Sequence, residues 1–262
     1  MIETRVKYFK GGNVNEVFKW STKLMVIMSL LSIVILCAGP LGYKSGVLPL
    51  QPALISLIVS LGIAVVTVIS SLVLFVLIKG RGLNQNRKFL LMALLISLIP
   101  SLLVGTQLKT ATSVPEIHDI TTDTINPPVF ENITVLRKDA PNGLVYEYQG
   151  SAEKLAELQR AAYPDLTSLI SSLSVKQVIE RATNILKGQG LDIVNVNHVK
   201  GIVEATATSF WYGFKDDVVV RVQATDLGSR IDLRSVSRVG RSDVGANAAR
   251  IRAFNKKFNA LE

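Results

Sequence analysis

Three long apolar runs without charged residues constrain this chain more than any other feature. They extend from Leu24 to Tyr43, from Ala53 to Ile78 and from Phe89 to Leu108. A transmembrane helix needs roughly 20 consecutive apolar residues, so each run is long enough to cross a bilayer. A single charge at the centre of such a helix costs about 2.5–3.5 kcal/mol, and none of the runs contains one. The sequence therefore predicts a membrane domain over residues 1–108 with three transmembrane helices.

The net charge of +9 is concentrated in this apolar half. Residues 1–108 carry 10 basic and 2 acidic side chains, whereas residues 109–262 carry 19 basic and 18 acidic ones. A basic protein often binds nucleic acid, but a basic excess confined to the flanks of membrane helices is an orientation signal. We therefore expect the lipid bilayer as a partner and no nucleic acid.

The basic flanks predict the orientation in the membrane. Basic residues precede the first run and fill the loop between the second and third runs: Arg5, Lys7, Lys10, Lys19, Lys23, Lys79, Arg81, Arg87 and Lys88. The loop between the first two runs carries only Lys44. Since basic loops stay in the cytoplasm, the N-terminus is expected there and everything after Leu108 outside. The expected location is a bacterial inner membrane, with the C-terminal domain in the periplasm.

Two processing alternatives and one transport alternative are disfavoured. The first run begins too late for a cleaved signal peptide, and Leu36 stands before Cys37, where a lipoprotein needs a small residue. Pumps and channels use ionisable groups inside the membrane, and the three runs contain none of the charged types. An anchoring or assembly role fits the runs better.

The second half predicts an α+β domain outside the membrane. Residues 109–132, rich in Thr, Pro and Asp, are expected to form a tether, and residues 133–262 the domain. Apolar spacing predicts helices over 152–162, from Val175 to Leu186, where Gly188 and Gly190 stop the helix, and over 244–259. Alternation predicts strands over 133–136, 144–148, 191–199, 202–211, 217–224 and 229–236. The last four are expected to form an antiparallel meander with one face open to water.

An arginine-rich corner is the first candidate site. No Gly-rich phosphate loop, no Gly-x-Ser-x-Gly and no Cys-x-x-Cys motif occurs in the chain, so we expect no cofactor and no metal. The candidate ligand-binding residues are Arg234, Arg238, Arg241, Ser242, Asp243, Asn247 and Arg250. Arginines beside a helix N-terminus can bind phosphate, a carboxylate or a lipid head group. Asp243 or Ser242 as N-cap would occupy the same donors, so a purely structural corner is the competing interpretation.

A second candidate lies before the domain, at His118, Asp119 and Asp123. One imidazole and two carboxylates can perform acid–base chemistry or bind a metal. Asp and Thr side chains at such a position more often cap turns. An enzyme would require this motif to fold back beside the arginine corner.

These residues also carry a family resemblance. The segments Ile117–Asp123, Asn126-Pro127-Pro128, Tyr163-Pro164-Asp165 and Arg234–Asn247, continuing to Arg252, resemble the bacterial domain of unknown function 1499 over about residues 110–258. Some relatives carry Pro-Asn-Cys-Val-Ser where this chain has His118–Asp123, so no role of that cysteine transfers. The resemblance implies a domain boundary and no activity.

Three functions follow as hypotheses. The favoured one is a multi-pass membrane protein whose periplasmic domain binds a membrane or periplasmic protein, or an anionic small molecule or lipid head group, without catalysis. The second is a periplasmic hydrolase or metal-dependent enzyme. The third is a structural subunit of a larger complex or homo-oligomer, because small residues in the second run, such as Ser56, Ser60 and Gly62, allow close helix packing.

Overall fold

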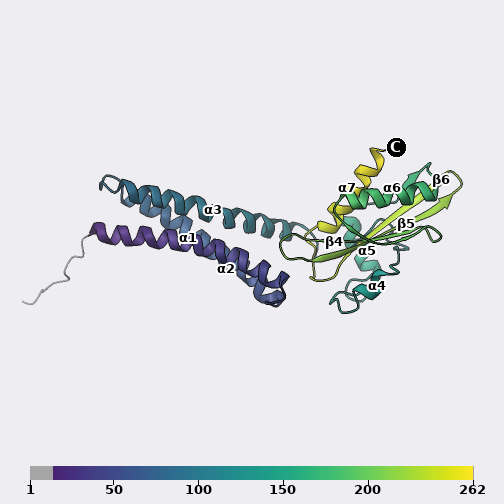
Figure 1. Ribbon diagram of the computed structural model, residues 1–262, viewed down its shortest axis with the longest axis horizontal. Helices are drawn as coiled ribbons and strands as arrows, with labels where there is room; N and C mark the ends of the chain where they lie inside the picture. Colours follow the sequence, from purple (N-terminus) through teal and green to yellow (C-terminus); the bar gives the residue numbers. More distant parts are fainter. Residues whose placement is uncertain (1–13, 262) are drawn as a thin grey trace, which may run out of the picture. The chain divides into compact units, whose positions relative to one another are not determined.

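Three long helices form the first part of the chain in this computed structural model, which describes residues 14–261. They are α1 (Val14–Lys44), α2 (Leu50–Leu77) and α3 (Asn84–Ser113), drawn in purple to blue in Figure 1. Each is long and apolar enough to cross a membrane by length and composition, which fits a membrane protein. The helices extend beyond the apolar runs because polar flanking residues continue them. Arg5, Lys7 and Lys10 of the orientation argument lie outside the described residues.

Small residues bring α1 and α2 together. Ser60 is fully buried, and its Oγ donates to the carbonyl of Ser32 at 2.7 Å. A Cβ on Gly39 would lie 1.8 Å from Oγ of Ser56, so only glycine fits there. The small residues Ser56 and Ser60 therefore serve packing within this chain, whereas Gly62 has open space beside it.

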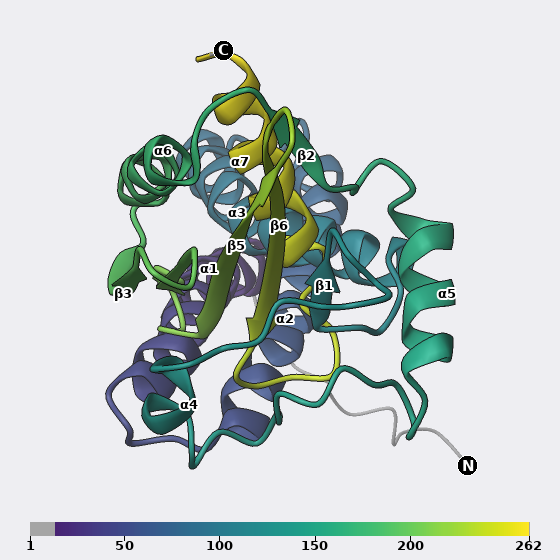
Figure 2. The same cartoon turned by 90° about the vertical axis from the view of Figure 1, so that its right-hand side faces the viewer.

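The chain divides into two compact units, residues 1–108 and 109–262, and the second holds an antiparallel sheet. Its strand order is β1-β6-β5-β4-β3, and the short β2 also pairs with β6. The strands are β1 (Asp119–Thr121), β2 (Leu169–Ser171), β3 (Asp192–Asn197), β4 (Ile202–Thr208), β5 (Lys215–Thr225) and β6 (Gly228–Ser237). Figure 2 shows β5 and β6 as its long central strands. The α+β fold class is confirmed.

One face of the sheet is covered by α6 (Val175–Gly188) and α7 (Ala246–Asn259). Ser174 and Gln177 form a capping box that begins α6. Apolar residues of both helices and of β4, β5 and β6 form the main core, with Phe254 and Phe258 fully buried in it. A further helix, α5 (Ala152–Ala162), contributes Leu155 to the same core.

The other face of the sheet is covered as well, so the prediction that one face is open to water is wrong. The segment after β1, with the single-turn helix α4 (Ile133–Leu136), packs Phe130 and Ile133 onto Val219 and Val236. The charged residues that alternate along the strands are buried beneath it rather than solvated: Glu204, Asp217, Asp232 and Arg234. They are tolerated there because each is paired or hydrogen-bonded.

Two predicted strands are also wrong. Residues 133–136 form α4, and residues 144–148 form an irregular segment with one isolated bridge from Tyr148 to Ser151. The segment 109–132, expected as a tether, contributes β1, which pairs with the end of β6 in register Asp119 to Val236. It thereby adds Ile117 and Ile120 to the core.

Candidate functional site

Arg234, the first residue of the predicted corner, lies on the covered face of the sheet. Its guanidinium binds both carboxylate oxygens of Asp119, with Nε at 3.0 Å and Nη2 at 2.6 Å. It also donates to the carbonyls of Pro128 and Leu144. The buried group thus joins β6 to β1 and to the covering segment, and all its nitrogen atoms have acceptors.

Arg238 forms a second buried cluster with Asp217. Nε and Nη2 of Arg238 each lie 2.8 Å from an oxygen of the Asp217 carboxylate. Arg137, which follows α4, donates to the same carboxylate at 3.1 Å, and Thr206 donates its hydroxyl at 2.7 Å. Burial acts most strongly on Arg137 and lowers the pKa of its guanidinium, against the raising effect of Asp217. Asp217 is fully buried and holds both cations in place.

Arg250 and Asn247 fasten α7 to the sheet. Arg250 donates to Asp216 at 2.7 Å and to the hydroxyl of Ser235 at 2.9 Å. Asn247 is fully buried, and its amide nitrogen donates to the carbonyl of His118 and to Ser237, each at 3.0 Å. Both side chains are therefore used within the fold.

The N-terminus of α7 is occupied by Asp243. The helix begins after Gly245, whose φ of 81° only glycine adopts easily, so neither Ser242 nor Asp243 is the N-cap residue as predicted. The carboxylate of Asp243 nevertheless accepts from the N–H groups of Gly245 and Asn247, each at 2.8 Å. Burial raises the pKa of Asp243, while these two donors lower it and nearby Asp216 raises it further. A ligand anion would have to displace this carboxylate.

Arg241 differs from the other candidate arginines because its side chain is 85% exposed. Its ion pair with Glu116, at 2.8 Å, is also at the surface, where such pairs contribute little. Ser242 beside it accepts from the N–H of Val244 at 3.1 Å. Of the predicted corner, Arg241 alone presents its guanidinium to solvent.

Asp123 lies in a different cluster from Arg238. It accepts from Arg221 at 2.9 Å and from Arg230 at 3.0 Å, and both arginines also bind Asp232. Burial raises the pKa of Asp123, but two backbone N–H donors and the two arginines bring it below its usual range. Arg230 lies near the start of β6 and Arg238 directly follows its end, so their Cα atoms are about 26 Å apart at about 3.3 Å per residue.

The residues of the second candidate site contact different parts of β6. The carbonyl of His118 accepts from Ser237, at the end of β6 remote from Asp123, while Asp119 is engaged by Arg234. The structure therefore does not bring His118, Asp123 and Arg238 into one pocket. Within residues 14–261, no three His, Cys, Asp or Glu side chains are grouped to hold a metal ion.

Glu204 is an organising residue that the sequence prediction missed. Its fully buried carboxylate accepts from the backbone N–H groups of Glu131, Asn132 and Ile133 at 2.6, 2.9 and 3.4 Å. Asn195 donates to it as well. A lone charged residue inside an otherwise uncharged strand, Ile202 to Ala207, was the available signal.

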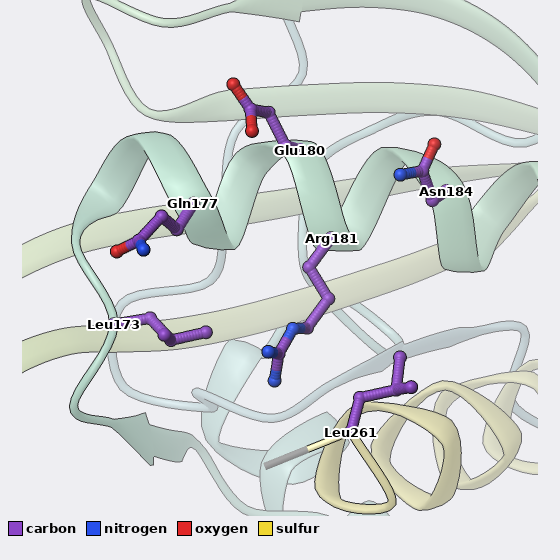
Figure 3. A pocket seen from close by; sticks show the side chains of 6 residues that line it. All are labelled: Leu173, Gln177, Glu180, Arg181, Asn184 and Leu261. Atoms are coloured by element: carbon purple, nitrogen blue, oxygen red, sulfur yellow. The ribbon is translucent and has the colours of Figure 1, made fainter.

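A shallow groove of about 400 Å³ lies beside α6. Figure 3 shows its lining, in which Arg181 extends from α6 toward the end of α7. The guanidinium of Arg181 lies 5.2 Å from the ring centre of Phe258. The other lining residues are Leu173, Gln177, Glu180, Asn184 and Leu261. None of the sequence-predicted site residues lines this groove.

Comparison with known proteins gives a family and no activity. No curated protein and no solved structure matches the chain. A family model described as "Protein of unknown function (DUF1499)" matches residues 119–258, which is more than half of the chain. The match begins at β1 and ends within α7, so it covers the sheet and both faces of its packing. The match also includes the paired residues of β1, β6 and α7 described above. The chain therefore belongs to the DUF1499 family.

Proposed function

We propose that this is a multi-pass inner-membrane protein whose DUF1499 unit lies in the periplasm and binds a protein partner or an anionic ligand without catalysis. The observation that carries the proposal is the asymmetry of basic residues around the three helices. Lys79, Arg81, Arg87 and Lys88 flank the α2–α3 turn, whereas Lys44 alone stands at the α1–α2 turn. Basic loops remain cytoplasmic, so an odd number of spans puts the C-terminal unit outside.

The contacts of the acidic and basic residues favour binding over catalysis. Catalytic groups need access to substrate and a partner that activates them. Asp119, Asp123 and Asp217 instead neutralise buried or half-buried arginines, and these pairs join the covering segment to the sheet. Arg241 remains as the cation that an external anion or an acidic protein surface could reach.

The orientation can be tested with single cysteines, because Cys37 in α1 is the one native cysteine. In a Cys37→Ser background, Leu227→Cys labels the exposed β5–β6 turn and Asn84→Cys labels the start of α3. A membrane-impermeant maleimide added to intact cells should modify the first and not the second. The reverse pattern would contradict the proposal.

The binding role can be tested at Arg241 with inorganic phosphate as the anion probe. Phosphate should raise the thermal unfolding midpoint of the detergent-solubilised chain, and Arg241→Gln should abolish the rise. Arg252→Gln is the matched control, because Arg252 is half-exposed and paired with Asp165. If the ligand is a protein, a photoreactive residue in place of Glu116 should crosslink to that partner, whereas a photoreactive residue in place of Leu227 should not. Absence of both effects would exclude this corner as the binding site.

A further inference from the structure

The tip of the β4–β5 hairpin carries exposed aromatic side chains on a firm backbone. Its residues are Ser209, Phe210, Trp211, Tyr212, Gly213 and Phe214. The N–H of Ser209 donates to the carbonyl of Phe214 at 2.8 Å, and Gly213 donates back to Ser209 at 3.0 Å. Phe210 is 80% exposed and Trp211 is 49% exposed, and their rings meet edge to face at 5.8 Å. Such exposure of two large aromatic residues is costly in water.

This tip projects from the end of the sheet at which the chain arrives from α3. The pairing puts Asp119 opposite Val236, Val236 opposite Asp217, and Asp217 opposite Thr206. These residues form one row across β1, β6, β5 and β4. Past that row, in the direction in which β6 ends, lie both the entry to β1 and the tip of the β4–β5 hairpin.

The connection from α3 to this end is short. Residues 114–118 join the end of α3 to the start of β1. Five residues span at most roughly 17 Å when fully extended. α3 is long and apolar enough to cross a membrane, and where it does so, a connection of this length limits the distance between the start of β1 and the bilayer.

The surroundings of the tip have the composition of a membrane interface. Lys215 at the base of β5 and Lys138 after α4 are exposed. Val135 and Leu136 of α4 are exposed as well, and Arg238 links this helix to the hairpin base through the carbonyl of Leu136. Aromatic rings at head-group depth with lysines around them are typical of segments that lie in the interface.

We infer that Phe210 and Trp211 insert into the lipid interface of the leaflet that faces the C-terminal unit. The hairpin then acts as a second attachment, which fixes the orientation of the sheet on the bilayer. The inference does not depend on which side of the membrane that leaflet belongs to. It is also independent of ligand binding at Arg241.

The test uses the full chain in lipid nanodiscs, where both faces are open to solvent. Trp20→Phe leaves Trp211 as the one tryptophan, since the chain has two. Phosphatidylcholine brominated near the top of its acyl chains, mixed with phosphatidylglycerol, should reduce Trp211 emission about twofold relative to unbrominated lipid. Iodide in the buffer should quench it weakly. Phe210→Ser should reduce the lipid quenching.

The matched control puts the reporter at the opposite end of the sheet. In the Trp20→Phe, Trp211→Phe background, Leu227→Trp occupies the β5–β6 turn, where Leu227 is 84% exposed. This reporter should be quenched by iodide and unaffected by bromine. Equal iodide quenching of Trp211 and the control would overturn the inference. Protection of Trp211 from both quenchers would also overturn it, because a protein or a second copy would then cover the tip.

Discussion

Replacing Arg234 by methionine tests whether the arginine corner is structural. The variant keeps most of the aliphatic stem and removes a guanidinium that is almost completely buried. It leaves the Asp119 carboxylate buried without its cation, and the carbonyls of Pro128 and Leu144 without donors. The rings of Phe130 and Tyr146, 5.7 and 5.6 Å from the guanidinium carbon, lose the cation as well.

The magnitude follows from these contacts. Removing one partner of a buried ion pair costs about 3–5 kcal/mol. With about 1 kcal/mol from the lost carbonyl hydrogen bonds, the expected loss is about 4–6 kcal/mol. That is a large share of the about 5–15 kcal/mol that stabilise a domain. Adding Asp119→Leu removes the orphaned carboxylate and should recover about half of the loss.

The free energy of unfolding of the C-terminal unit can be measured by pulse proteolysis of the detergent-solubilised chain in urea. Arg241→Met is the control within the same segment, and it should stay within about 0.5 kcal/mol of wild type because the side chain is exposed. A loss below about 1 kcal/mol for Arg234→Met would refute the structural interpretation. Arg234 would then be available to a ligand.

Three further outcomes are expected. Glu204→Gln should destabilise the unit by about 1–3 kcal/mol and speed hydrogen exchange at the start of α4, because the amide can accept at one oxygen only. Asp123 has a lowered pKa, so its stabilising contribution is present above the unfolded value of about 3.9 and lost as the pH falls through the folded value. The gap in unfolding free energy between wild type and Asp123→Asn should therefore narrow in acid, and a constant gap would contradict this. Gly39→Leu should lower the thermal midpoint of the membrane unit by collision with Ser56, whereas Gly62→Leu should not.

The periodic elements could be predicted from the sequence because their signals are local. Uncharged runs identify helices long enough to cross a membrane. Apolar spacing from Val175 to Leu186 identifies α6, which ends at Gly188, one of the two glycines expected to stop it. Alternation identifies the strands from β3 to β6, since their inward apolar residues pack on the apolar faces of α6 and α7. For these elements, local preference and final packing agree.

The elements that depend on distant partners could not be predicted. Ile133 to Leu136 are residues typical of a strand, yet they form a helical turn because Glu204, distant in sequence, binds the preceding N–H groups. β1 and β2 have three residues each and exist through pairing with β6, so they lack a period of their own.

The covered face shows a general ambiguity of alternating patterns. A strand that alternates Ile231 and Leu233 with Arg230, Asp232 and Arg234 looks half-solvated from its sequence. Here the register puts Asp232 opposite Arg221 on β5, so the charges neutralise one another across strands. The one available signal was the near balance of acidic and basic residues after Lys109, which permits pairing without identifying it.

The residues that carry the family resemblance are largely those that close the fold. Asp119 and Arg234 join the first strand to the last, Arg238 holds the covering segment through the carbonyl of Leu136, and Asn247 binds α7 to the sheet. A motif composed of such contacts identifies a way of packing the fold. Proteins that share the motif can differ at their exposed positions. Membership of the family therefore transfers the fold, whereas function depends on the exposed residues. Among these, Arg241 and the aromatic hairpin are the features to be tested.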